Sequence, residues 1–171
     1  YRSEAQARHL PRVGLLQIVN ELATRGLCDP LFPTDSDQYG LIEIARKRFK
    51  QASETVKSQS SLQGILVVLD AADNAQLEAE ARNEIAFPRL LLASLSAEPI
   101  EGVKLLLTAR PHRMESVIGK SQTKRLALEP FTKEETWSFL ETRRKNITDV
   151  EFSTVFARSQ GNARVLEYLV E

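Results

Sequence analysis

The stretch that decides the fold is Gly64-Ile65-Leu66-Val67-Val68-Leu69-Asp70-Ala71-Ala72-Asp73-Asn74, in which five apolar residues run directly into two spaced carboxylates. An unbroken apolar run is typical of a strand that is buried on both faces in a helix-covered parallel sheet. Ligands of such sheets bind outside the carboxyl ends of the strands. Asp70 is therefore placed to hold a hydrated Mg²⁺ and, through it, nucleotide phosphates. The plain structural alternative is an aspartate that starts a turn or caps the next helix.

A second apolar stretch, Gly102–Pro111, favours the metal-binding interpretation of Asp70 over the structural one. It ends in Thr108 and Arg110 rather than in an acid. The residues between the two runs are typical of a helical crossover, which predicts parallel neighbouring strands with a right-handed connection. Asp70 and Arg110 would then emerge at the same edge of the sheet. A metal-binding acid beside a phosphate-sensing cation is an arrangement that serves phosphoryl transfer.

The order of four segments resembles that of the STAND class of P-loop ATPases, and within it the NACHT branch and the prokaryotic antiviral STAND ATPases. The segments are Leu-Asp-Ala-Ala-Asp (69–73), Leu-Leu-Leu-Thr-Ala-Arg-Pro (105–111), Leu-Glu-Pro-Phe-Thr-Lys-Glu-Glu (128–135) and Gln-Gly-Asn-Ala-Arg-Val-Leu (160–166). The resemblance covers residues 60–171. It implies an α/β fold: a partial P-loop NTPase domain, three-layer αβα with a parallel sheet, followed by a small helical-bundle subdomain.

The resemblance also implies roles for the residues at the two strand ends. Asp70 matches the Walker B acid, which holds Mg²⁺ through water. Asp73 matches the second acid, a catalytic group that positions the attacking water. Arg110 matches the catalytic sensor that reads the γ-phosphate. Thr108, at the same strand end as Arg110, joins Asp70 among the residues expected to contact the nucleotide.

Two more residues of the expected nucleotide site come from the helical part. Gly161 and Asn162 match a Gly-Asn-Pro motif of the family and are expected to contact the cofactor. Ala163 stands where proline is usual in that motif. This departure weakens the expectation that the loop closes over the nucleotide as it does in the family.

The phosphate-binding loop of the family is missing from the sequence. No Gly-x-x-x-x-Gly-Lys-Ser/Thr occurs among the 171 residues. Without it there is no nest of backbone N–H groups and no lysine to cradle the β- and γ-phosphates. Since the chain starts at Tyr1 rather than Met, we expect a fragment of a longer protein that lacks the Walker A loop and does not hydrolyse ATP by itself.

The composition limits the function classes. The 23 basic and 23 acidic residues cancel, which argues against a broad nucleic-acid surface. Cys28 is the only cysteine, so neither an intrachain disulfide nor a cysteine-based metal site can form. No apolar run has the length of a membrane span, and no signal peptide is present. We therefore expect a cytoplasmic location and no membrane partner.

Pro130 is the predicted domain boundary. Residues 1–129 form the partial nucleotide-binding domain with its Walker B and sensor strands, and residues 130–171 form the helical lid. In the first part we expect helices over residues 15–23, 41–56, 75–95 (broken or kinked at Pro88) and 111–118, and a brief strand over 125–128. In the second, Thr132 and Thr148 each open a capping box, and Gly161-Asn162 ends the second helix and allows a third, which predicts a bundle of three short helices.

As the resemblance implies, the intact protein would bind ATP with Mg²⁺ and use it as a signalling switch. Recognition by other domains of a protein ligand, such as a phage-derived one, would drive self-association in antiviral defence. Two alternatives stay open. One is a catalytically inactive nucleotide-binding or assembly scaffold, and the other is a STAND-type transcription regulator with a DNA-binding domain elsewhere.

Overall fold

The computed structural model describes residues 10–32, 37–59, 63–144 and 146–170. The chain divides into two compact units, residues 1–124 and 125–171, shortly before Pro130. The roles predicted for the two parts stay predictions. Within the described ranges, no helix is both long and apolar enough to cross a membrane.

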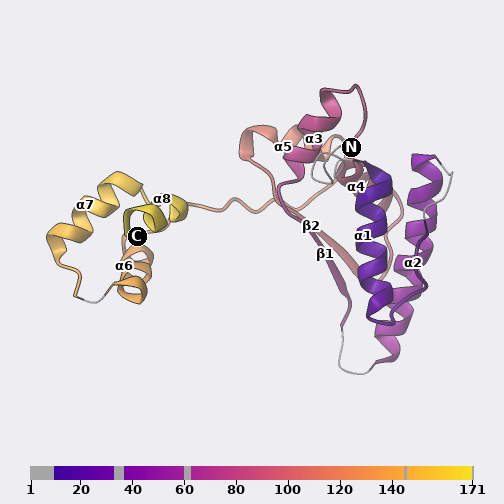
Figure 1. Ribbon diagram of the computed structural model, residues 1–171, viewed down its shortest axis with the longest axis horizontal. Coiled ribbons are helices and arrows are strands. Elements are labelled where there is room, and N and C mark those ends of the chain that lie inside the picture. The colour runs from indigo at the N-terminus through magenta and orange to yellow at the C-terminus, as the bar shows by residue number, and fades with distance from the viewer. Residues whose placement is uncertain (1–9, 33–36, 60–62, 145, 171) are drawn as a thin grey trace. The chain divides into compact units, whose positions relative to one another are not determined.

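The first unit consists of a small sheet and the helices that pack against it (Figure 1). Its elements are α1 (Pro11–Thr24), α2 (Gln38–Ser58), β1 (Ile65–Leu69), α3 (Ala72–Glu80), α4 (Phe87–Ala97), β2 (Val103–Leu107), the short 3₁₀ turn η2 (Pro111–Arg113) and α5 (Met114–Ile118). The predicted helices around residues 15–23 and 41–56 are confirmed, and Asp37 caps the second by accepting a hydrogen bond from the Gly40 N–H. The helix expected over 75–95 is divided in two, with Pro88 in the first turn of α4, where its missing N–H costs nothing.

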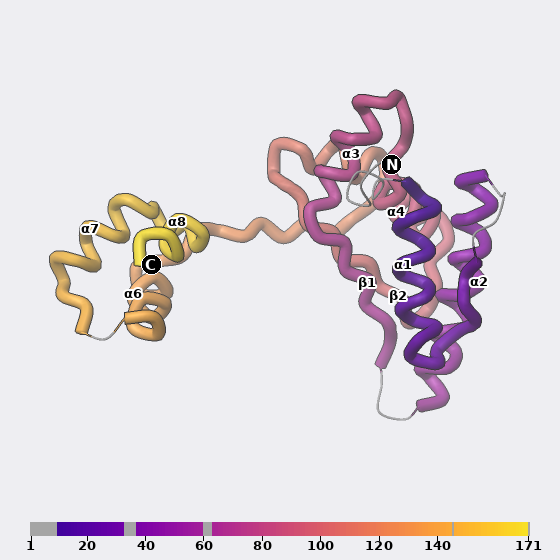
Figure 2. The backbone as a smooth tube through the Cα atoms, viewed as in Figure 1, coloured from indigo at the N-terminus to yellow at the C-terminus, as the bar shows by residue number. Residues whose placement is uncertain are grey.

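The two strands are adjacent and parallel, as predicted. The register runs from Ile65 opposite Val103 to Leu69 opposite Leu107. Figure 2 traces the backbone from β1 through α3 and α4 into β2, so the crossover is helical. Such a connection is what parallel neighbours require.

The predicted three-layer αβα P-loop fold is wrong. The chain is mostly helical, at 61%, and its described residues hold one parallel sheet of two strands. Helices cover one face of this sheet, because Ile65, Val67 and Leu69 are buried whereas Leu66 and Val68 are 59% and 53% exposed. An unbroken apolar run shows that both faces of a strand tolerate burial. It does not show that a second helical layer exists, because other residues must supply that layer.

The core of the first unit lies between the helices and the covered face of the sheet. Leu15 of α1, Phe49 of α2 and Leu91 of α4 are fully buried, and α2 packs against both strands. Burying side chains of this size contributes about 2–3 kcal/mol each. This packing holds β1 and β2 in place, and thereby fixes what emerges at their carboxyl ends.

The second unit is the predicted bundle of three short helices, α6 (Lys133–Arg143), α7 (Asp149–Ser159) and α8 (Ala163–Val170). Both capping boxes are confirmed: Thr132 pairs with Glu135, and Thr148 with Glu151. The Thr148 N–H donates to the Glu151 carboxylate, and this bond holds the pKa of Glu151 below its usual value.

The core of this bundle is small and aromatic. Leu140 and Leu166 are buried at its centre, and the ring centroids of Trp137 and Phe152 are 4.9 Å apart in an edge-to-face contact.

The prediction of a strand over residues 125–128 is wrong. This segment is not paired with another strand, and Leu126 and Leu128 are 74% and 97% exposed.

Candidate functional site

Thr108 ties the two strand ends together. Its hydroxyl donates to Asp70 Oδ1 at 2.5 Å and accepts the Ala71 N–H at 2.8 Å. Its carbonyl accepts the Ala72 N–H at 2.9 Å. Ala71 adopts a left-handed conformation (φ 51°), which turns the chain sharply from β1 into α3. Thr108 thereby fixes the orientation of Asp70, whose side chain is exposed at the carboxyl edge of the sheet.

Asp73 and Arg110 form an ion pair beside this turn. Asp73 lies in the first turn of α3 with its side chain 3% exposed, whereas that of Arg110 is 51% exposed. Arg110 Nε donates to Asp73 Oδ2, and its Nη2 donates to Asn74 Oδ1 at 3.0 Å. The buried charge of Asp73 is therefore compensated by a cation that water can reach. The sequence did not assign Asn74 to the site, and an uncharged residue beside two aspartates carries no signal for it.

The predicted gathering of Asp70, Asp73 and Arg110 at one sheet edge is confirmed, while their chemical roles stay predictions. Asp70 and Asn74 line a groove of about 870 Å³ that runs along β1, and neither Asp73 nor Arg110 belongs to its lining among the described residues.

A second ion pair joins the two segments that carry Asp73 and Arg110. Arg113 of η2 donates to Glu80 at the end of α3, with 2.6 Å between Nη2 and Oε2. This hydrogen bond holds the pKa of Glu80 below its usual value. It joins the segment after Arg110 to the helix that carries Asp73, so it helps to position the Asp73–Arg110 pair.

Gly161 and Asn162 have structural roles within the second unit. Asn162 Oδ1 accepts the N–H groups of Arg164 and Val165 at 3.1 and 3.2 Å, and so caps α8. Gly161 has φ 75°, and its carbonyl accepts the Phe131 N–H at 2.8 Å. These contacts explain the Gly-Asn pair without a ligand, and its nucleotide contacts stay a prediction.

Asp70 is the residue that the sequence predicts to hold a metal ion, and its role as a metal ligand stays a prediction. Nowhere in the described ranges do three or more His, Cys, Asp or Glu side chains cluster closely enough to enclose a metal ion. Mg²⁺ does not need such a cluster, because it retains several waters and uses one or two carboxylates together with phosphate oxygens. Asp70 is exposed, and its Oδ1 accepts the hydrogen bond from the Thr108 hydroxyl.

Comparison with known proteins finds no family model that matches this chain and no curated protein that matches it.

Proposed function

We propose that the carboxyl edge of β1 and β2 is part of a Mg²⁺–ATP site in an ATP-dependent signalling switch of the STAND type. Such a switch would self-associate when a protein ligand is recognised, in anti-phage defence. The observation that carries the proposal is the meeting of Asp70, Thr108, Asp73 and Arg110 at the ends of two adjacent parallel strands.

Asp70 is the metal-associated group in this proposal. Its Oδ2 would hold a water of the hydrated ion, and the Thr108 hydroxyl keeps Oδ1 in place. When bound, Mg²⁺–ATP would supply the transferable phosphoryl group and neutralise its charge. The contribution of the protein is the fixed position of one carboxylate at the strand end, since placement supplies most of the catalysis in phosphoryl transfer.

The Asp73–Arg110 pair is the switching element. Arg110 is half-exposed, so a phosphate oxygen could replace Asp73 as the partner of its guanidinium. Asp73 would then lose its compensating cation inside the protein, where an unpaired charge is costly. It would regain a partner by accepting a hydrogen bond from water. In this proposal Arg110 senses phosphate, and Asp73 positions water, only when the ion pair between the two residues is open.

A scaffold without catalysis is the second candidate, and one observation favours it. The Asp73–Arg110 pair already has protein partners without a ligand, because Arg110 donates to both Asp73 and Asn74. In that case the strand ends would serve only to hold β1, α3 and β2 together.

Binding of a fluorescent ATP analogue distinguishes the two candidates. The 171-residue chain is expected to bind the analogue weakly in Mg²⁺ and not in EDTA, and to show no ATP turnover. Asp70→Asn is expected to weaken the Mg²⁺-dependent binding by about tenfold or more, the usual effect of disturbing a metal site. The matched control is Asp29→Asn, which changes another exposed aspartate of the first unit.

Binding that is independent of Mg²⁺, or equal in Asp70→Asn and the wild type, would contradict the nucleotide proposal. An absence of binding would favour the scaffold. Brisk turnover by the wild-type chain would show that the catalytic parts are placed wrongly.

A further inference from the structure

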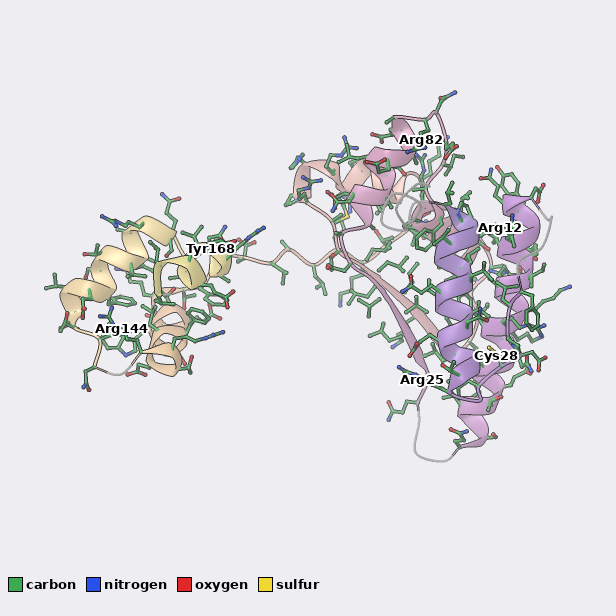
Figure 3. The ribbon with its side chains drawn as sticks, in the orientation of Figure 1. Arg12, Arg25, Cys28, Arg82, Arg144 and Tyr168 are labelled. Carbon is green, nitrogen blue, oxygen red and sulfur yellow. The ribbon has the colours of Figure 1, made fainter. Side chains whose placement is uncertain are left out.

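One face of α3 carries a cluster of polar side chains. Asp73, Gln76 and Glu80 are three and four residues apart, a spacing that places them on the same side of a helix. Asp73 and Gln76 are buried, at 2% and 3% exposure. Arg82, which Figure 3 labels just beyond α3, pairs instead with Glu78 on the opposite side of the helix. The cluster is therefore separate from this surface pair.

Two arginines from the segment after β2 reach the cluster. Arg110 donates to Asp73, and Arg113 donates to Glu80 with 2.6 Å between Nη2 and Oε2. Gln76 lies between the two acids along α3, and its Nε2 donates to Glu80 Oε1 at 3.1 Å. Among the described side chains, Glu80 thus has two hydrogen-bond donors whereas Asp73 has one.

The cluster also has unused hydrogen-bonding capacity. Gln76 Oε1 and Arg113 Nε are both buried, and neither finds a partner in the part of the chain that the structure describes. Buried polar atoms without a partner are uncommon. If Gln76 released Glu80, Arg113 Nε could donate to the vacated oxygen. Glu80 would then still accept two hydrogen bonds, both from Arg113, in the strong bidentate form.

We propose that Gln76 is a positioning residue for Asp73, which turns from Glu80 to the Asp73 carboxylate when Arg110 leaves its ion pair. Residues three positions apart on a helix have Cβ atoms about 5–6 Å apart, within reach of a glutamine amide. Helical side chains also lean towards the N-terminus of their helix, which is the direction from Gln76 to Asp73. The inference rests on the proposed function only for the group that draws Arg110 away, a phosphate.

The turn of Gln76 offsets the loss of Arg110. Without Arg110, Asp73 stays buried with an unpaired charge, which is costly. The Gln76 amide supplies a hydrogen bond from inside the protein to one carboxylate oxygen, and the other oxygen remains for a water molecule. Gln76 thereby fixes the orientation of the carboxylate that is proposed to position the attacking water.

A double-mutant cycle on the full chain tests the proposal without any ligand. Gln76→Met removes both polar atoms of the amide at nearly constant volume. In the wild type it is expected to change the urea midpoint of the first unit little, because Arg113 keeps Glu80 paired. In Arg110→Ala the same change is expected to lower the midpoint by a further 0.3 M or more (a rough estimate), because Gln76 has become the partner of Asp73.

A control and a rescue separate this coupling from a general loss of stability. Gln17→Met makes the same substitution at an exposed position on α1 and should have equal effects in both backgrounds. Asp73→Asn, added to Arg110→Ala, removes the buried charge, and the further loss caused by Gln76→Met should then disappear. If Arg110→Ala does not fold, Arg110→Lys takes its place, with a smaller further loss expected because a charge remains near Asp73.

The side-chain amide signals of Gln76 in NMR spectra give a second readout, and their absence from Gln76→Met identifies them. They are expected to move in Arg110→Ala and to return towards their original positions when Asp73→Asn is added. Equal effects of Gln76→Met in the two backgrounds, or amide signals that Arg110→Ala leaves unmoved, would overturn the proposal. Because no nucleotide is present, this outcome is distinct from a failure of ATP-analogue binding, which would overturn the proposed function instead.

Discussion

Arg110→Ala is expected to lower the free energy of unfolding of the first unit by about 2–3 kcal/mol. The reason is the burial of Asp73, whose side chain is 3% exposed and would lose the cation that compensates its charge. Because Arg110 itself is half-exposed, water can partly replace it, and the cost stays at the lower end for a broken buried pair. Urea unfolding followed by far-UV circular dichroism measures the change.

Two controls separate this effect from a general loss of surface charge. Arg25→Ala breaks an exposed pair with Glu21 and is expected to cost about 0.5 kcal/mol or less. Arg110→Ala/Asp73→Asn removes the buried charge together with its partner, and should recover most of the lost stability. If Arg110→Ala costs no more than Arg25→Ala, Asp73 is not held as a buried anion, and the switching role proposed for the pair fails.

Gly161→Ala is expected to destabilise the second unit by at least about 2 kcal/mol, and to unfold much of it. Gly161 has φ 75°, a conformation that costs energy for any residue with a Cβ. An added Cβ would also lie 2.3 Å from the Phe131 carbonyl oxygen, so the backbone has to move. A unit as small as residues 125–171 has little stability to spare.

The single tryptophan, Trp137, reports this unit alone. Its emission is expected to shift to the red in Gly161→Ala, while unfolding of the first unit is unchanged. Gly26→Ala is the matched control, because Gly26 has φ 70° with open space around it, and it should cost only about 1 kcal/mol. Native emission with unchanged cooperativity in Gly161→Ala would show that this turn can relax.

The strand pairing and the capping boxes could be predicted because both rest on patterns that the sequence itself displays. The apolar runs before Asp70 and Thr108, separated by helical sequence, are sufficient to place two parallel strands side by side. The capping boxes at Thr132 and Thr148 each need only two residues three positions apart. The two groups of a capping box lie within one short segment, whereas each strand is identified by its own apolar run and the helical sequence between the runs requires that they pair in parallel.

The remaining features depend on what else packs nearby, which a sequence pattern does not reveal. Leu66 and Val68 look like core residues, but no described helix covers their face of the sheet. Residues 125–128 have the pattern of a strand, and a strand forms only where a partner edge is present. Asp73 and Arg110 were assigned separate tasks, whereas the turn after β1 brings them into direct contact.

The most direct measurement of the central claim is paramagnetic broadening of backbone amide signals when Mn²⁺ and ATP are added in place of Mg²⁺–ATP. The proposed site predicts that the amides of Ala71 and Ala72, beside Asp70, broaden first, and that Asp70→Asn abolishes this selective effect. The amides of the capping box at Thr148, in the second unit, serve as the internal reference. Broadening that spares Ala71 and Ala72, or that persists unchanged in Asp70→Asn, would contradict a metal–nucleotide site at the carboxyl ends of β1 and β2.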